Sequence, residues 1–355
     1  MSIRVKFVSR VDPREWTRYF PGEDGRWGAC HFLFDRDERH YDWLVAYDDV
    51  APAKGQNRES AHELLACPDE QTLLVTTEPS SIKAYGKAFA AQFGHVLTSQ
   101  PAWALPHRRR HFQQAANHWF YGSAPDHWMD RKTLVAGPSV ADKAGDISAV
   151  FSAKRQSHTL HAQRYRFIQA LVQQLPEIEL FGRGARPMND KAEALSPFRY
   201  HLAVENHVAP HHITEKLTDC FLGRCLPFYV GAPNAADYFP EGSFIPLDID
   251  DPVAAAQTIR DAIRDNAWEK RLHLIDEARR RVLEEHHLFA VIERIVRQSG
   301  SATVSPSQRQ TIYGRHAWRR KFKLSAARYM AEKVYVRARA IAEKHRFHRQ
   351  RGSRT

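Results

Sequence analysis

The sequence predicts an α/β protein built from two domains and followed by a basic helical tail. The chain has 355 residues, which is more than one domain of the usual size, about 100–150 residues, accounts for. Short apolar stretches of strand character alternate with helical stretches, and this alternation indicates mainly parallel sheets with helices on both faces. The composition is 43% hydrophobic and 11% aromatic, so apolar side chains suffice for two cores.

The first domain is expected at residues 1–140. Short apolar runs predict four strands, at 3–8, 43–47, 73–77 and 96–98. A loop-rich segment with several Trp, Tyr, His and Pro residues follows these strands. We place the junction with the next domain at 137–145, because Gly, Pro, Ser and Asp collect there.

The second domain is expected at residues 146–300. Helical spacing appears from Arg164 and from Ile213, and a long helical stretch at 253–296 is broken near Asn266. Between the helices the pattern predicts strands at 147–152, 200–204 and 226–230. Residues 299–310 are interpreted as a linker, and residues 311–355 as the tail.

Residues 200–233 contain the clearest functional signal. A half-buried strand ends at Glu205-Asn206, and Thr214-Glu215-Lys216 then opens a helix. Free backbone N–H groups and the helix dipole favour anions at such a helix start, and Lys216 adds a positive charge. The pattern therefore indicates a phosphate site in which Glu215 addresses a hydroxyl or a sugar that develops positive charge. The local alternative is an ordinary helix-start Glu beside a solvated Lys.

The same segment resembles the donor-binding motif of the α-1,3/4-fucosyltransferases, glycosyltransferase family 10. The family hallmark is roughly Y-x-F-x-L-x-F-E-N followed by Y-[IV]-T-E-K, and this chain has FRYHLAVEN at 198–206 and ITEK at 213–216. The spacing from Asn206 to Lys216 matches without a gap, and the likeness continues through LPFYVG at 226–231 and SFIP at 243–246. His212 departs from the pattern, because the family has Tyr there, and this leaves another nucleotide sugar as an alternative donor.

Two further segments carry the resemblance, which covers about residues 147–250. Arg164 stands where the family has an Arg that contacts the donor pyrophosphate, and ELFGRG at 179–184 is similar to a family strand and turn. The resemblance, to the bacterial type without an N-terminal membrane anchor, implies the GT-B fold. In that fold two Rossmann-type domains face each other across a cleft, and ligands bind beyond the carboxyl ends of the strands.

The resemblance implies an inverting glycosyltransferase that moves fucose from GDP-fucose to a hydroxyl of a glycan acceptor, such as a surface polysaccharide or lipopolysaccharide. Lys216, Arg164 and the helix start would stabilise the leaving pyrophosphate, while Asn206 and Glu215 would hold the sugar. Glu215 is therefore also a candidate catalytic residue. The implied donor-binding residues are Arg164, Asn206, His212, Thr214, Glu215 and Lys216.

The general base is expected in the first domain, and our candidate is Glu78. It ends the predicted strand LLVTT at 73–77 and is followed by Pro79. Members of the family place a Glu in a similar setting at a strand end. Asp48 and Asp49, after the strand at 43–47, are the rival carboxylates, and a strand-terminating surface Glu is the structural alternative.

No metal and no cofactor besides the donor are expected. The two Asp-x-Asp patterns, at 35–37 and 248–250, are interpreted as turn and cap residues. The 20 histidines lack the ligand spacing of a metal site on one helix face. The four cysteines are scattered and form neither a disulfide framework nor a zinc pattern.

The net charge of +11 is concentrated in the tail. Residues 315–355 contain 14 of the 52 basic residues and 2 of the 41 acidic ones, so residues 1–314 are nearly neutral. Apolar and aromatic side chains are threaded among these cations, which predicts a basic amphipathic helix on an anionic membrane surface. The alternatives are a disordered, merely solubilising tail and contact with nucleic acid, which we do not expect without an RNA- or DNA-binding signature.

No apolar run reaches the length of a membrane span, and the N-terminus lacks a signal-peptide core. We therefore expect a cytoplasmic enzyme that is peripheral to the inner face of the membrane. An alternative from another functional class is a non-catalytic binding protein on a transferase scaffold, which docks on membrane or nucleic acid through its tail.

Overall fold

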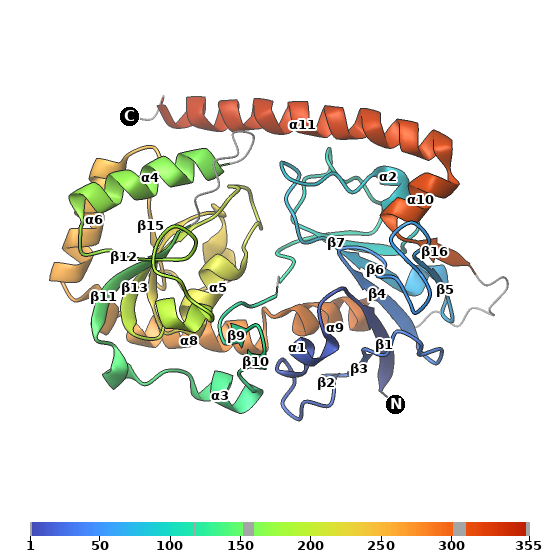
Figure 1. Ribbon diagram of the computed structural model, residues 1–355, viewed down its shortest axis with the longest axis horizontal. Helices are drawn as coiled ribbons and strands as arrows, with labels where there is room; N and C mark the ends of the chain where they lie inside the picture. The colour runs from blue at the N-terminus through green and yellow to red at the C-terminus, as the bar shows by residue number, and fades with distance from the viewer. Residues whose placement is uncertain (1, 117, 152–159, 301–309, 353–355) are drawn as a thin grey trace. The chain divides into compact units, whose positions relative to one another are not determined.

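The computed structural model describes residues 2–116, 118–151, 160–300 and 310–352, with side chains of the last helix described up to residue 343. The chain divides into two compact units. Unit 1 comprises residues 1–16, 24–115 and 292–355, and unit 2 comprises residues 17–23 and 116–291. Each unit contains a mainly parallel sheet (Figure 1). The predicted fold class is therefore confirmed, since two Rossmann-type α/β units are the composition of the GT-B fold.

Unit 1 is built on a seven-stranded sheet with the order β2-β3-β1-β4-β6-β7-β8. All neighbouring strands are parallel except β2, which runs antiparallel to β3. The predicted strands at 3–8, 43–47, 73–77 and 96–98 are present within two residues of their expected bounds. The strands are β1 (Ile3–Val8), β2 (Arg26–Trp27), β3 (Cys30–Leu33), β4 (Trp43–Tyr47), β6 (Thr72–Val75), β7 (His95–Thr98) and β8 (Arg110–Phe112).

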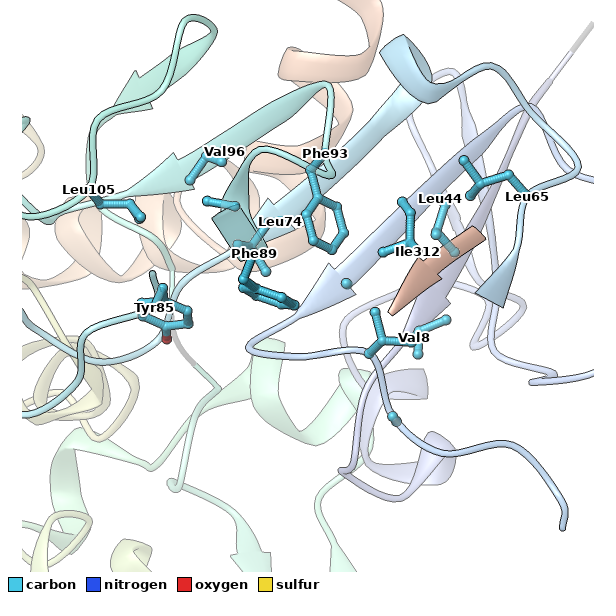
Figure 2. Close-up of a cluster of buried hydrophobic side chains, with 14 of the residues drawn as sticks. Val8, Leu44, Leu65, Leu74, Tyr85, Phe89, Phe93, Val96, Leu105 and Ile312 are labelled. Atoms are coloured by element: carbon cyan, nitrogen blue, oxygen red, sulfur yellow. The ribbon is translucent and has the colours of Figure 1, made fainter. Parts of the chain in front are cut away.

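The core of unit 1 explains why these runs become strands. In β6 all four residues are buried, and in β4 all but the last are, as expected for parallel strands that are covered on both faces. Figure 2 shows how helix α2 (Lys87–Ala90) and its neighbours cover one face with aromatic rings. The labelled members of this cluster are Val8, Leu44, Leu65, Leu74, Tyr85, Phe89, Phe93, Val96, Leu105 and Ile312.

The tail is an integral part of unit 1. Its first residues form β16 (Thr311–Tyr313), which pairs antiparallel with β5 (His62–Leu64) and buries Ile312 in the core. Two helices follow, α10 (Arg315–Lys321) and α11 (Lys323–Gly352), and α11 packs against α2. The predicted tail helix is thus present, although a strand precedes it. No helix among the described residues is both long and apolar enough to cross a bilayer.

Unit 2 contains a five-stranded, fully parallel sheet with the order β12-β11-β13-β14-β15. Helix α4 packs with α6, and α5 packs with α8, with the sheet between the two pairs (Figure 1). The strands are β11 (Gly145–Val150), β12 (Glu179–Phe181), β13 (Phe198–Val204), β14 (Leu226–Val230) and β15 (Ile245–Pro246). The helices are α4 (His161–Gln174), α5 (Glu215–Leu222), α6 (Pro252–Arg264), α7 (Ala267–Lys270) and α8 (Leu272–Glu284), followed by α9 (Leu288–Ser299).

The expected break near Asn266 is present. Asn266 has a φ of 49° and stands between α6 and α7, in the left-handed conformation that Asn tolerates better than most residues. The remaining short elements are α1 (Pro13–Thr17), α3 (Arg131–Ala136), β9 (Ser123–Ala124), β10 (His127–Trp128) and four 3₁₀ turns, η1 (Asp69–Gln71), η2 (Val140–Asp142), η3 (Lys191–Ala194) and η4 (Ala235–Asp237).

The units differ from the expected domain ranges of 1–140, 146–300 and 311–355 at both ends of the second domain. Residues 116–140 group with unit 2, where the backbone N–H of Gly122 donates to Asp190 and the guanidinium of Arg131 donates to the Leu283 carbonyl. Residues 292–355 group with unit 1, where the carboxylate of Glu293 accepts from the backbone N–H of Ala29. Part of the expected linker, residues 301–309, lies outside the described residues.

A buried ion pair in unit 1 generates a test of stability. The ammonium group of Lys6 is fully buried and lies 2.8 Å from the carboxylate of Glu63, which Arg36 and Arg39 also contact. We expect Glu63→Gln to lower the free energy of unfolding by about 3–5 kcal/mol, because it leaves buried cations without their counter-charge. Chemical denaturation followed by a probe in unit 1 measures the change.

The matched control is Glu59→Gln, which removes an ion pair with Arg320 whose side chains are both more than 60% exposed. This change is expected to cost no more than about 1 kcal/mol. Equal losses in the two variants would show that burial of the Lys6–Glu63 pair does not determine its contribution.

Candidate active site

A cavity of about 420 Å³ opens at the carboxyl ends of β11 and β13 in unit 2. Such sheet ends are where ligands bind in open α/β folds. The start of α4 and the start of α5 both contribute to its wall. The lining residues are Phe120, Ser123, Val150, His161, Arg164, Met188, Asn189, Lys191, His201, Leu202, Ala203, Val204, Asn206, Glu215 and Lys216.

The carboxylate of Glu205 fixes the start of α5. Glu205 follows the last residue of β13 and is fully buried. It accepts a hydrogen bond from the backbone N–H of Thr214 at 2.9 Å, and the Thr214 hydroxyl lies 2.8 Å from both carboxylate oxygens. Thr214 is also the N-cap residue of α5, and its hydroxyl accepts from the backbone N–H of Lys216. The strand end and the helix start are therefore held together by one buried carboxylate.

Lys216 and Glu215 form an ion pair at the cavity wall. The Lys216 ammonium is 2.8 Å from a Glu215 oxygen and 3.5 Å from a Glu205 oxygen. Burial alone raises the pKa of Glu215, but the charges of Lys216 and Lys191 outweigh it and hold this pKa at about 2. Burial alone lowers the pKa of Lys216, but Glu215 and Glu205 outweigh it and raise this pKa. Both side chains of the pair are therefore charged at neutral pH.

Arg164 reaches the cavity from the first turns of α4. Its guanidinium donates to the Asn206 side-chain oxygen at 3.0 Å and to the Val150 carbonyl at 2.8 Å. These two acceptors lie at the ends of adjacent parallel strands, so they set the direction of the guanidinium. The arrangement places a fixed cation and a mobile one, Arg164 and Lys216, on the same cavity.

Four of the six predicted donor-binding residues line the cavity: Arg164, Asn206, Glu215 and Lys216. Thr214 is instead buried beneath the helix start, where it binds Glu205. His212 is buried as well, and its ring packs edge-on against His207 with centroids 5.3 Å apart. Burial holds the pKa of His212 well below the usual value for histidine, so its ring is neutral. Among the described residues His212 is not part of the cavity wall.

The predicted base, Glu78, lies in unit 1, three residues after β6 ends. Its backbone N–H is 3.4 Å from the Tyr85 hydroxyl, and its carbonyl accepts from the Gln100 amide at 2.7 Å. These contacts fix the backbone that carries the side chain. Its role in catalysis stays a prediction.

The two rival carboxylates are engaged in structural interactions. Asp48 accepts from Thr77 at 2.8 Å and from Tyr85 at 2.6 Å, and it forms an ion pair with Lys83. Asp49 is buried and contacts the guanidinium groups of Arg10 and Arg315.

Several residues of the site escaped prediction. Lys191 lines the cavity and lies 3.0 Å from Asp219, and it also donates to the Glu215 carbonyl at 3.2 Å. The signal that could have found it is the capping box of η3, in which Asp190 and Glu193 bracket a helical turn that starts at Lys191. His201, on β13, binds Ser148 through its ring nitrogen at 2.8 Å.

The two Asp-x-Asp patterns lie in turns, as expected. In each, the first carboxylate accepts from the backbone N–H two residues on: Asp35 from Asp37 at 2.9 Å, and Asp248 from Asp250 at 3.0 Å. Within the part of the chain that the structure describes, no three or more His, Cys, Asp or Glu side chains are grouped to hold a metal. Independence from metal stays a prediction.

A parallel sheet with a cation-lined cavity at its carboxyl ends is an arrangement found in nucleotide-binding α/β domains. Residues 140–267 match a family model, described as glycosyltransferase family 10 (fucosyltransferase), C-term. The predicted resemblance to the α-1,3/4-fucosyltransferases is thereby confirmed for the domain that contains the cavity.

Characterised relatives match the same part of the chain. The 4-galactosyl-N-acetylglucosaminide 3-alpha-L-fucosyltransferase FUT6 of Pongo pygmaeus is 31% identical over 114 residues, which are 30% of this chain and 31% of the relative. The alpha-(1,3)-fucosyltransferase FucT of Helicobacter pylori is 27% identical over 96 residues, 25% of this chain and 20% of the relative. The matched regions thus span about a third or less of these relatives. A solved alpha1,3-fucosyltransferase with GDP-fucose is similar over 77% of this chain and 81% of its own, at 15% identity and a TM-score of 0.44.

The contact between Thr214 and Glu205 can be tested by substitution. We expect Thr214→Val to lower the free energy of unfolding by about 1–3 kcal/mol, because it leaves a buried carboxylate without its hydroxyl donor and removes an N-cap. Thr214→Ser keeps the hydroxyl and should retain most of the stability. Thermal and chemical denaturation measure both variants, and an equal loss in the two would contradict a specific contribution of the Thr214 hydroxyl.

Proposed function

We propose that the protein is a fucosyltransferase that moves fucose from GDP-fucose to a hydroxyl of a glycan acceptor. The observation that carries this proposal is that Arg164, Lys216 and the start of α5 meet in one cavity of the domain that matches the fucosyltransferase family. The volume of about 420 Å³ falls within the range of about 300–1,000 Å³ that is usual for small-ligand sites.

The diphosphate of the donor would lie between Arg164 and Lys216. A guanidinium offers paired N–H donors to phosphate oxygens, and a lysine adds a compact charge that can follow the ligand. The positive end of the α5 dipole lies at the start of this helix, where it also favours an anion. As the bond from the sugar to the phosphate breaks, these groups would stabilise the charge that develops on the leaving group.

We infer that the transfer is an inverting, single displacement without a metal. The acceptor hydroxyl would lose its proton to Glu78 as its oxygen bonds to the sugar carbon and the GDP leaves. Glu215, with its pKa held at about 2, would be ionised beside a sugar that carries developing positive charge. Asn206, whose side-chain oxygen accepts from Arg164, could present its amide N–H to a sugar hydroxyl.

Transfer of another sugar is the second candidate, and His212 favours it. The residue replaces the family's Tyr and is buried against His207 away from the described cavity wall. A donor panel therefore decides which sugar is transferred.

We propose further that α11 holds the enzyme on the inner, anionic face of a membrane and that the acceptor is a surface polysaccharide or lipopolysaccharide. One face of α11 packs in unit 1 through Tyr329 and the buried Val336. A second face exposes large apolar side chains, with Leu324 at 81% and Val334 at 67% exposure. Lys323, Lys333 and Arg337 lie on the same helix, and cations beside exposed apolar side chains favour an anionic lipid surface.

The first functional prediction concerns the donor. We expect GDP-fucose and GDP to raise the melting temperature of the protein, with no effect of EDTA, and Lys216→Ala to weaken their binding by about tenfold or more, because a charge-assisted contact to phosphate is lost. Calorimetry measures the affinities. The control is Lys270→Ala, an exposed lysine of the same unit. Stabilisation by a different nucleotide sugar would discard fucose and keep the transferase.

The second functional prediction concerns the general base, Glu78. Glu78→Gln should bind donor with normal affinity and lose about 10²-fold or more of its turnover, because a positioned general base contributes about 10²–10⁴-fold. Release of GDP in the presence of acceptor measures turnover. Unchanged turnover would remove Glu78 from the reaction and point to Asp48 or Asp49.

The third functional prediction concerns binding of α11 to a membrane surface. Val334→Glu should reduce binding to anionic vesicles in a sedimentation assay, because it puts a carboxylate on the exposed apolar face of α11. Val253→Glu is the matched control, since Val253 is 66% exposed on α6 of unit 2. A point substitution is preferred to deletion of the tail, because deletion would uncover the core of unit 1. Equal vesicle binding by both variants would contradict the proposal.

A further inference from the structure

A second cavity, of about 240 Å³, lies within unit 1 where the tail helices meet the chain segment at 85–89. It shares no residue with the cavity of unit 2. The first wall is formed by the segment that leads into α2, and the second by α10 and α11. The lining residues are Tyr85, Gly86, Lys87, Ala88, Phe89, Arg315, Trp318, Arg319, Ser325, Arg328, Tyr329 and Glu332.

Both walls of this tail cavity are fixed by specific contacts. The Tyr329 hydroxyl donates to the carbonyl of Ala84 at 3.2 Å, and the Glu332 carboxylate accepts from the backbone N–H of Lys87 at 2.9 Å. Gly86 has a φ of 91°, and a Cβ there would come within 2.9 Å of the Tyr329 ring. At the other end of the cavity the backbone N–H of Arg315 donates to the buried carboxylate of Asp49 at 2.9 Å. The cavity is thus a formed site and not a loose gap between two segments.

Positive charge dominates the lining. Four basic residues, Lys87, Arg315, Arg319 and Arg328, surround the cavity, against one acidic residue, Glu332. Arg315 is paired with Asp49, whereas the other three form no ion pair with any residue that the structure describes. Among the described residues, three of the four cations around this small cavity therefore have no ion-pair partner.

The positions of these cations suit an anion with several oxygens. The guanidinium of Arg319 is held over the Tyr329 ring at 4.6 Å, and its Nε donates to the Arg315 carbonyl at 3.0 Å, which leaves its terminal N–H groups for a ligand. Ser325 adds a hydroxyl to the lining. Guanidinium groups bind phosphate through paired hydrogen bonds, and several cations around one cavity suit an anion that has more oxygens than a carboxylate.

We propose that the tail cavity binds a phosphate ester, either as a soluble phosphate compound or as the head group of an anionic lipid. The volume, below the usual range of about 300–1,000 Å³ for drug-sized ligands, fits a phosphate with a few attached atoms better than a nucleotide. Phe89, Trp318 and Tyr329 give the remaining wall an aromatic surface, against which the carbon part of such a ligand packs.

Occupation of the cavity would fasten the tail to the body of unit 1. The ligand contacts both walls, so it binds only when α10 and α11 are docked. Its binding multiplies the ratio of docked to undocked tail by one plus the ligand concentration divided by the dissociation constant. The Tyr85 ring belongs to the same wall, and its hydroxyl contacts the backbone of Thr77 and Glu78. The site therefore lies behind the loop that carries the predicted base, although its existence does not depend on the proposed transferase activity.

The test uses the full-length protein and a pair of matched double variants. Lys87→Gln with Arg328→Gln removes two exposed cations that line the cavity, and Lys54→Gln with Arg108→Gln removes two exposed cations of unit 1 that lie neither in this lining nor on α11. Calorimetry with inorganic phosphate and with glycerol 3-phosphate, at constant ionic strength, measures binding. We expect the first double variant to lose about tenfold or more of its affinity for the phosphate compounds. The second should bind them as the unsubstituted protein does.

Only the binding that the first double variant loses is assigned to the tail cavity, so phosphate bound in unit 2 does not affect the comparison. Sedimentation with phosphatidylcholine vesicles, with and without phosphatidic acid, distinguishes the two sources of phosphate. A selective loss of phosphatidic-acid binding in the first variant identifies a lipid head group, and a loss confined to the soluble compounds identifies a soluble ligand. Equal binding by both double variants in every assay would overturn the proposal.

Discussion

The buried carboxylate of Glu205 is the interaction on which the site depends. It stands at the point where β13 ends, and its partners are the N-cap Thr214 and the ammonium group of Lys216. A charge in such a place is costly unless hydrogen bonds satisfy it, so the strand end and the helix start cannot separate without leaving it unpaired. Because α5 begins at this contact, the positions of Glu215 and Lys216 follow from it.

This contact also explains why the helix start at Thr214-Glu215-Lys216 could be predicted from the sequence. Many of the residues that surround it in the folded protein could not be predicted in this way. The start of α5 is encoded locally, since Thr214 is a capping residue and the apolar spacing changes just after it. The strands were predictable for the same reason: buried parallel strands are continuous apolar runs of limited length, as in β4, β6 and β14. The capping box around Lys191 marks only the start of a helical turn in the sequence, and it is the folded chain that brings Lys191 to Asp219 and to the cavity.

The domain boundaries and the position of the tail also depend on contacts that local sequence patterns do not predict. Arg18 binds carbonyl groups about a hundred residues away in the sequence, and no local sequence pattern predicts such a partner. The strand β16 pairs with β5 across about 250 residues of sequence, so a segment that looks like a charged tail contributes Ile312 to a core. Charge and amphipathicity indicate what a segment can bind, but they do not reveal that one of its faces is already used within the protein.

The pairing of Glu215 with Lys216 has a consequence for how a cavity of this kind can bind an anion. A lysine in a largely buried position loses hydration and tends to lose its proton, which would weaken any contact with a diphosphate. Two carboxylates beside Lys216 raise its pKa and keep it charged before a ligand arrives. Only one of them is fixed, since Glu205 is held by Thr214 while Glu215 lies on the cavity wall. An incoming diphosphate can therefore take over the ammonium from Glu215, and the carboxylate released by this exchange remains at the same wall. Binding of the leaving group and exposure of an anion toward the sugar would then be a single event, which gives a physical reason for adjacent acidic and basic residues at the start of this helix.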